Sequence, residues 1–318
     1  KFFKKLKIKN AEKQKHFTLA AVSLIAIALG IGAFQRNQVW QTPLSLWEDV
    51  YSKTPDSPRA MNVLGVSYLN LELYDKGISI LERCHSIAST YLPCMVHIGL
   101  AYSKVKRFDE GLAILKKGHS LDPYYPHINY HLGVYYKEFF GDFESAKKHF
   151  QLVLEKTAGR MFHAAVKLAE IAFEEGRVDE GMGFVNFVLK IDKSNAEAWE
   201  AYGKGQIVSG KLQTAGEVFQ KLLQSAPESP RYFLNLANLA ERSGDLNTAK
   251  AYYERVVSMS DITIQGWQGL ARVAGRLGLS PLLKQSQEKI ELLKRTGNFI
   301  YLPSMFLVGE KAKQIKPS

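Results

Sequence analysis

The feature that most constrains the fold is a pattern of small and bulky side chains that recurs about every 34 residues. A small residue recurs at intervals of 34, 34, 36, 34, 34 and 34, at Gly65, Gly99, Gly133, Ala169, Gly203, Ala237 and Ala271. A second small position and a bulky position four residues after it keep the same register, at Gly77/Leu81, Gly111/Leu115, Ala146/Phe150, Gly181/Val185, Ala215/Phe219 and Ala249/Tyr253. A fixed period of this length predicts stacked copies of one structural unit.

Each unit is predicted to be a pair of antiparallel helices. A small residue lets two helices approach closely, and bulky residues fill the remaining space. Turn signals such as Gly176-Arg177 and Gly244-Asp245 fall between the two helices of a unit, and Pro123 stops a helix at a unit end. The predicted units are 58–91, 92–125, 126–161, 162–195, 196–229, 230–263 and 264–293.

The repeat resembles the tetratricopeptide repeat (TPR), which implies an all-α, right-handed superhelical solenoid over residues 58–296. The third unit carries about two extra residues, which we place in the turn from Lys137 to Asp142 and at the unit's end. The last unit is degenerate, because Leu283 stands where a small residue is expected. Within the linker, 36–57, we expect a lone helix at 42–55, and we expect the tail, 297–318, to cap the open end of the stack.

An uncharged stretch precedes the repeats. Residues 17–34 carry no charge, and at 1.5 Å per residue a helix of this length spans about 27 Å, the thickness of a bilayer core. A buried core helix is the alternative, but its polar stripe would be wider than Thr18 and Ser23. We therefore predict one transmembrane helix at 17–35, rather than a cleavable signal peptide.

The charge distribution predicts the orientation of this span. Residues 1–15 hold seven lysines and one acid, Glu12, so +6 of the net charge of +11 lies there and +5 on the rest. The basic flank, 1–16, is therefore placed in the cytoplasm, and the repeats in the periplasm or an organelle lumen. The same concentration of charge argues against nucleic-acid binding. Because the chain begins at Lys1 and not at Met, we expect it to be a piece of a longer or processed protein.

A second resemblance covers the junction between the apolar stretch and the repeats. Arg36-Asn37 with Trp40, then Trp47 with Asp49, lead into the first unit. This order is similar to that of membrane O-mannosyltransferases with transmembrane and TPR regions, of the GT-C type. The resemblance implies that this chain is the last transmembrane helix and the C-terminal repeat domain, and that the catalytic residues lie upstream.

No catalytic or cofactor motif is found in the sequence, so we expect no enzyme, cofactor or metal site within these residues. His127, His131 and His163 have no matching carboxylate, which favours surface or groove histidines over metal ligands. Cys84 and Cys94 are the only cysteines. A disulfide between them is one interpretation, but two unpaired cysteines in small buried positions are favoured.

The predicted binding surface is the concave groove lined by the first helix of each unit, which would take a protein or an extended peptide. Acidic side chains such as Glu170, Glu174 and Glu200 make its middle acidic, and its C-terminal end is basic. Asparagine amides and arginine forks at that end would hold a carboxylate. The candidate binding residues are Arg59, Asn62, Asn70, Tyr130, Asn235, Asn238, Arg242, Arg272 and Arg276.

The predicted function is therefore a membrane-anchored scaffold on the extracytoplasmic side that recruits polypeptides to a glycosyltransferase-like membrane domain. The alternative is a non-enzymatic scaffold for envelope, secretion or pilus assembly.

Overall fold

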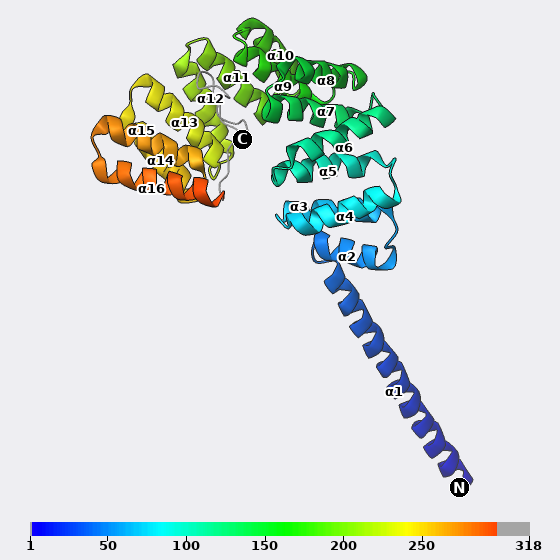
Figure 1. The fold of residues 1–318 in the computed structure, drawn as a ribbon. Helices are drawn as coiled ribbons and strands as arrows, with labels where there is room; N and C mark the ends of the chain where they lie inside the picture. The colour runs from blue at the N-terminus through cyan, green and yellow to red at the C-terminus, as the bar shows by residue number, and fades with distance from the viewer. Residues whose placement is uncertain (1, 298–318) are drawn as a thin grey trace. The chain divides into compact units, whose positions relative to one another are not determined.

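The computed structural model describes residues 2–297, and within the N-terminal helix it describes the side chains of Lys15 and of most residues from Thr18 onward. Every element in this part of the chain is a helix, so the all-α prediction is confirmed (Figure 1). The tail from residue 298 onward, with its predicted capping role, lies outside the described residues, as does Lys1.

The chain forms two compact units, the first ending at Pro123 and the second beginning at Tyr124. The first unit begins with a long helix that projects from the helix pairs of that unit (Figure 1). The helices of the first unit are α1 (Phe2–Val39), α2 (Pro43–Lys53), α3 (Pro58–Asn70), α4 (Tyr74–Ile87), α5 (Leu92–Lys104) and α6 (Phe108–Leu121). The lone helix predicted within the linker is α2.

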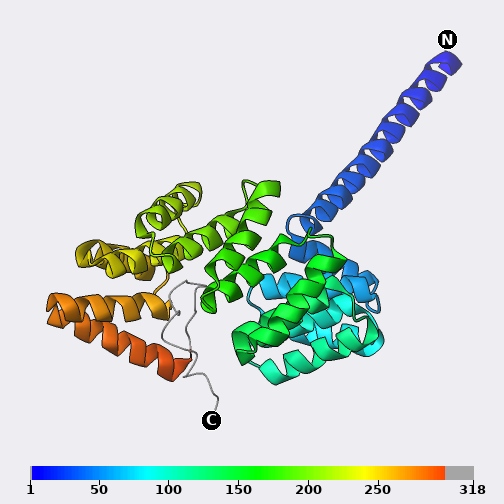
Figure 2. The same cartoon turned by 90° about the horizontal axis from the view of Figure 1, so that it is seen from above.

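The second unit contains five helix pairs, and the second helix of each pair packs on the first helix of the next (Figure 2). The first pair includes a short π-helix. The elements are α7 (Pro126–Tyr135), η1 (Tyr136–Phe140), α8 (Phe143–Lys156), α9 (Phe162–Glu174), α10 (Val178–Ile191), α11 (Ala196–Val208), α12 (Leu212–Ser225), α13 (Pro230–Ser243), α14 (Leu246–Met259), α15 (Ile264–Leu277) and α16 (Ser280–Thr296).

The small and bulky residues of each unit form one packing pair. A Cβ atom on Gly65 would lie 2.5 Å from Cγ of Leu81, and one on Gly203 would lie 2.6 Å from the ring of Phe219. Both bulky side chains are fully buried. The two positions keep a common register because each glycine makes room for the bulky residue of its own unit.

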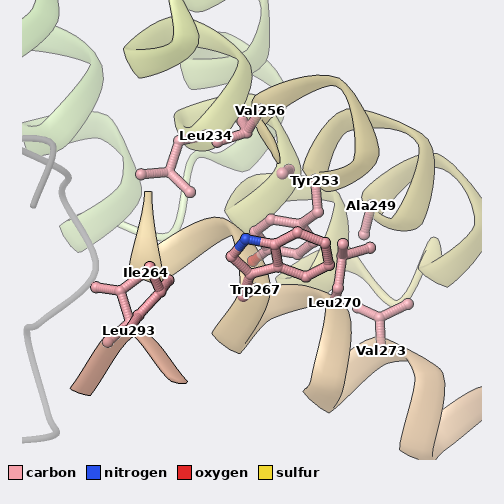
Figure 3. Packing of buried hydrophobic residues seen from close by; sticks show 10 residues of the cluster. Leu234, Ala249, Tyr253, Val256, Ile264, Trp267, Leu270, Val273 and Leu293 are labelled. Carbon is pink, nitrogen blue, oxygen red and sulfur yellow. The ribbon is translucent and has the colours of Figure 1, made fainter. Parts of the chain in front are cut away.

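The last two pairs share a core around Tyr253 and Trp267 (Figure 3). Tyr253 comes from α14, Trp267 and Leu270 come from α15, and Leu293 from α16 completes the cluster. The degenerate unit lacks a small residue at Leu283, and Ser286 is the fully buried small residue of α16 instead.

The extra residues of the third repeat unit sit at the turn and at the end of that unit. The turn contains η1, and it closes at Gly141, whose φ of 65° is left-handed and suits glycine. At the end of the unit, Ala158 and Gly159 both have positive φ, 49° and 74°.

The preference for unpaired cysteines is wrong. Cys84 at the end of α4 and Cys94 at the start of α5 form a disulfide, with Cα atoms 6.3 Å apart. The short α4–α5 connection brings the two small positions within bridging distance, because antiparallel neighbours meet at their shared turn. The disulfide therefore joins the first helix pair to the next.

The predicted transmembrane segment, 17–35, lies within α1. Among the residues that the structure describes, none of the helices has the length and apolar character needed to cross a membrane.

Candidate functional site

The first helices of successive pairs in the second unit carry a row of basic side chains and glutamates on η1, α9, α11 and α13. We call this row the charged ladder. It consists of four cations and four anions, which are Lys137, Lys167, Lys204, Arg231, Glu138, Glu170, Glu174 and Glu200.

Glu170 is the centre of the charged ladder. Its Oε1 accepts from Nζ of Lys204 at 2.7 Å, and its Oε2 accepts from Nζ of Lys167 at 2.8 Å. Nζ of Lys137 lies 2.9 Å from Glu174 and 3.8 Å from Glu170. One carboxylate thus connects three lysines from three successive first-helix segments.

The ladder continues to α13 through Glu200. The side chain of Glu200 is only 2% exposed, and its Oε1 accepts from Nε of Arg231 at 2.8 Å. A second guanidinium nitrogen of Arg231 contacts the other carboxylate oxygen, so the contact has the bidentate form that favours arginine. Nζ of Lys204 lies 3.7 Å from Glu200 and links this end to Glu170.

The pKa shifts show that the ladder is electrostatically balanced. Burial alone would raise the pKa of Glu170, but Lys204, Lys167 and Lys137 hold it well below its usual value. Burial alone would lower the pKa of Lys137, but Glu170, Glu138 and Glu174 raise it instead. The prediction of an acidic middle was therefore incomplete, because four cations neutralise the four anions.

The repeat period itself creates contacts between consecutive first helices. Glu170 and Lys204 are 34 residues apart, as are His163 and Glu197, whose side chains lie 2.5 Å apart. Lys167 was not singled out from the sequence. Its position three residues before Glu170, on the same helix face, was the signal that would have found it.

The predicted carboxylate-binding end contains an internal carboxylate. Arg272 donates to both oxygens of Glu241, from Nε at 3.0 Å and from Nη2 at 2.9 Å. The hydroxyl of Tyr253 lies 2.5 Å from Oδ1 of Asn238 and 2.7 Å from Oε2 of Glu241. Arg272 and Asn238 are thus occupied by groups of this chain, whereas Arg276 is exposed.

Asn235 on α13 is fully buried, and neither its Nδ2 nor its Oδ1 has a hydrogen-bond partner in the described structure. A buried amide without partners costs free energy, and a native structure rarely keeps one without a reason. Arg242 lies in the last turn of the same helix.

The remaining candidate residues are spread over both units. In the first unit Arg59 and Asn70 are exposed, and Oδ1 of Asn62 lies 2.8 Å from Nδ1 of His97. In the second unit Tyr130 is half-buried, which raises the pKa of its hydroxyl. Its ring contacts that of His163, with centroids 6.4 Å apart.

The histidines do not assemble a metal site in the part of the chain that the structure describes. No three His, Cys, Asp or Glu side chains are close enough there to hold an ion. His163 pairs with Glu197, and the ring of His131 packs against Tyr130, with centroids 5.4 Å apart.

Comparison with known proteins identifies the repeat. The tetratricopeptide repeat family matches residues 58–91 and 230–262. These two segments are tetratricopeptide repeats. Each match corresponds to one predicted unit, α3–α4 and α13–α14.

Solved structures support the same fold for most of the chain. A tetratricopeptide repeat protein from Parabacteroides merdae has a TM-score of 0.60 and 13% identity, over 77% of this chain and 92% of that chain. The APC/C hetero-tetramer Cut9–Hcn1 has a TM-score of 0.59 and 13% identity, over 76% of this chain and 45% of the other. A search of curated proteins finds no match. The chain is thus a TPR-like helical solenoid.

Proposed function

We propose that this protein is a scaffold that binds an extended polypeptide along the first helices of its second unit. The charged ladder carries this proposal. It places eight charged side chains in a row across η1, α9, α11 and α13, and several of them remain partly exposed, among them Glu138 at 41% and Arg231 at 31%. TPR-like solenoids use first-helix side chains of this kind to hold peptides.

The balanced charge of the charged ladder selects a particular kind of partner. A strongly acidic or basic peptide would be attracted by one side chain of the charged ladder and repelled by the next, because cations and anions alternate. An extended chain with mixed charges suits this surface better.

The test is peptide selection on the purified chain, followed by affinity measurements on charged-ladder variants. Display-selected peptides would be measured by fluorescence anisotropy against Arg231→Ala and Glu138→Ala, at two partly exposed positions of the charged ladder. The matched control is Lys221→Ala, on the exposed side of α12 and outside the charged ladder. We expect the two ladder-side variants to weaken binding by about tenfold and the control to leave it unchanged. Equal affinity for all variants would refute the proposed site.

We also propose that the scaffold works outside the cytoplasm. The Cys84–Cys94 disulfide supports this, because structural disulfides persist in oxidising compartments. The membrane anchor predicted at 17–35 stays part of this proposal, and α1 leaves apolar side chains such as Leu24 and Leu29 exposed. A phosphatase fused after Ser318 reports the compartment. An active phosphatase would support an extracytoplasmic location of the repeats, and an inactive fusion would contradict it.

The proposed recruitment of polypeptides to a glycosyltransferase-like membrane domain depends on the linker resemblance at Arg36, Trp40 and Trp47. In the structure Arg36 pairs with Asp49 at 2.8 Å, which ties the end of α1 to α2. The sequence upstream of Lys1 would distinguish this role from that of a non-enzymatic scaffold for envelope, secretion or pilus assembly. Several further apolar spans would support the transferase, and an initiator Met close to Lys1 would support an assembly scaffold.

A further inference from the structure

The outer face of α10 carries an apolar slot that side chains of this unit leave open. It has a volume of about 390 Å³ and is lined by Leu154, Glu180, Gly183, Phe184 and Phe187. A Cβ atom on Gly183 would meet no atom within 4 Å. Glycine is among the least favourable residues inside a helix, and no contact in the described structure requires it here.

Phe187 forms one wall of this slot. The tip of its ring points at Gly159, where a Cβ atom would lie 2.7 Å from Cζ of Phe187. The side chain nevertheless remains 40% exposed. The tip of the ring is thus held against this chain, and its exposed part is free for a partner.

The residues around the slot form a stripe with palindromic spacing. Glu180, Gly183, Phe187 and Lys190 are separated by three, four and three residues, which places them on one face of α10. All four are exposed. If two copies of α10 pack antiparallel about a two-fold axis beside residue 185, position 180 faces 190 and position 183 faces 187. Each contact then occurs twice, as a two-fold interface requires.

The chemistry of the facing positions is complementary. The ring of Phe187 from one copy meets the missing side chain of Gly183 in the other, so the helices can approach closely. Glu180 meets Lys190 of the second copy. Arg177 contacts Oε2 of Glu180, which leaves Oε1 available, and Lys190 has no ion-pair partner among the described residues.

We propose that this stripe is a self-association surface, through which two copies of the chain pair α10 against α10 in an antiparallel two-fold arrangement. The stripe involves about three helical turns, so the interface is smaller than that of a permanent dimer. The dimer therefore depends on protein concentration. This proposal is independent of peptide binding, because the stripe lies on the second helix of its pair and the charged ladder on first helices.

The decisive test compares charge-reversal variants of the full chain by sedimentation velocity across a wide concentration range. In the two-fold register, Glu180→Lys or Lys190→Glu alone places like charges opposite each other twice. We expect each to weaken dimerisation by about tenfold. The double variant restores both contacts, so it should dimerise like the wild type. Any association through α1 is common to all variants and cancels in the comparison.

Two further variants test the apolar part. Phe187→Glu should abolish dimerisation, whereas Leu292→Glu, on α16 with a similar exposure of 42%, should leave it unchanged. Gly183→Leu should fill the slot and weaken dimerisation while raising the melting temperature of the chain, since leucine favours a helix more than glycine does. The proposal is overturned if the double charge reversal fails to recover association, or if Phe187→Glu associates like Leu292→Glu.

Discussion

Replacing Glu170 by glutamine tests whether the charged ladder holds the second unit together. Glu170 accepts hydrogen bonds from Lys204 and Lys167, at 2.7 and 2.8 Å, and its side chain is 12% exposed. Glutamine keeps the shape of the side chain but removes the charge. Three lysines that now share one carboxylate would then repel one another across three successive first-helix segments.

The expected loss of stability follows from burial and from the partners that remain. Removing one partner of a fully buried ion pair costs about 3–5 kcal/mol. Here Lys137 keeps Glu174 at 2.9 Å, and Lys204 keeps Glu200 at 3.7 Å. We therefore expect Glu170→Gln to lower the free energy of unfolding by about 2–3 kcal/mol, below the fully buried case.

Urea denaturation followed by circular dichroism at pH 7 measures this loss from the midpoint and the slope. The control is Glu228→Gln, whose 84%-exposed side chain pairs with Arg255 at 3.6 Å and should change stability by less than about 1 kcal/mol. Equal losses for the two variants would refute the assigned role of Glu170.

A pH series sharpens the Glu170 prediction. Because the folded-state pKa of Glu170 lies well below its usual 4.5, its contribution is fully present above pH 4.5 and is lost as the pH falls through the folded-state pKa. The stability difference between the wild type and Glu170→Gln should therefore shrink below pH 4.5. A constant difference down to the acid transition would contradict the cause given for the shift.

Three other predictions concern packing, titration and the disulfide. Gly65→Ala should destabilise the chain by about 1–2 kcal/mol, because the added methyl group meets Leu81, whereas Gly275→Ala, with no atom within 4 Å, should stabilise it by up to about 1 kcal/mol in the same urea assay. Burial and the contact with Glu82 raise the pKa of Tyr102 from 10 to about 12. The contribution of Tyr102 to stability is therefore present below pH 10 and is lost as the pH rises through about 12. An absorbance titration that places the pKa of every tyrosine near 10 would be inconsistent with this. Reducing the Cys84–Cys94 disulfide, which closes a sequence separation of 10, should cost about 3 kcal/mol, and an unchanged melting temperature in reductant would show that it contributes nothing.

The sequence predicted the helix pairs because their packing depends on residue size alone. Gly65 and Leu81, or Gly203 and Phe219, fit together through steric contact at a fixed spacing, which a single sequence displays directly. The pairing of Glu170 with Lys204 was also visible in principle, because both residues occupy the same position of consecutive repeats.

Other features of the site depend on side-chain directions that spacing does not define. Arg272 and Glu241 are 31 residues apart, close to one repeat, yet only the structure shows that they pair with each other instead of facing a ligand. The disulfide depends on how tightly the α4–α5 turn closes, which the residue pattern leaves open. The buried, unpartnered amide of Asn235 likewise becomes apparent only when the neighbours of α13 are in place.

Hydrogen–deuterium exchange of the full chain, with and without a display-selected peptide, tests the proposed function most directly. If an extended polypeptide binds along the charged ladder, added peptide should protect the amides of α9, α11 and α13, while those of α10 and α12 exchange as before. Protection confined to α10 and α12, with the first helices unaffected, would contradict the account.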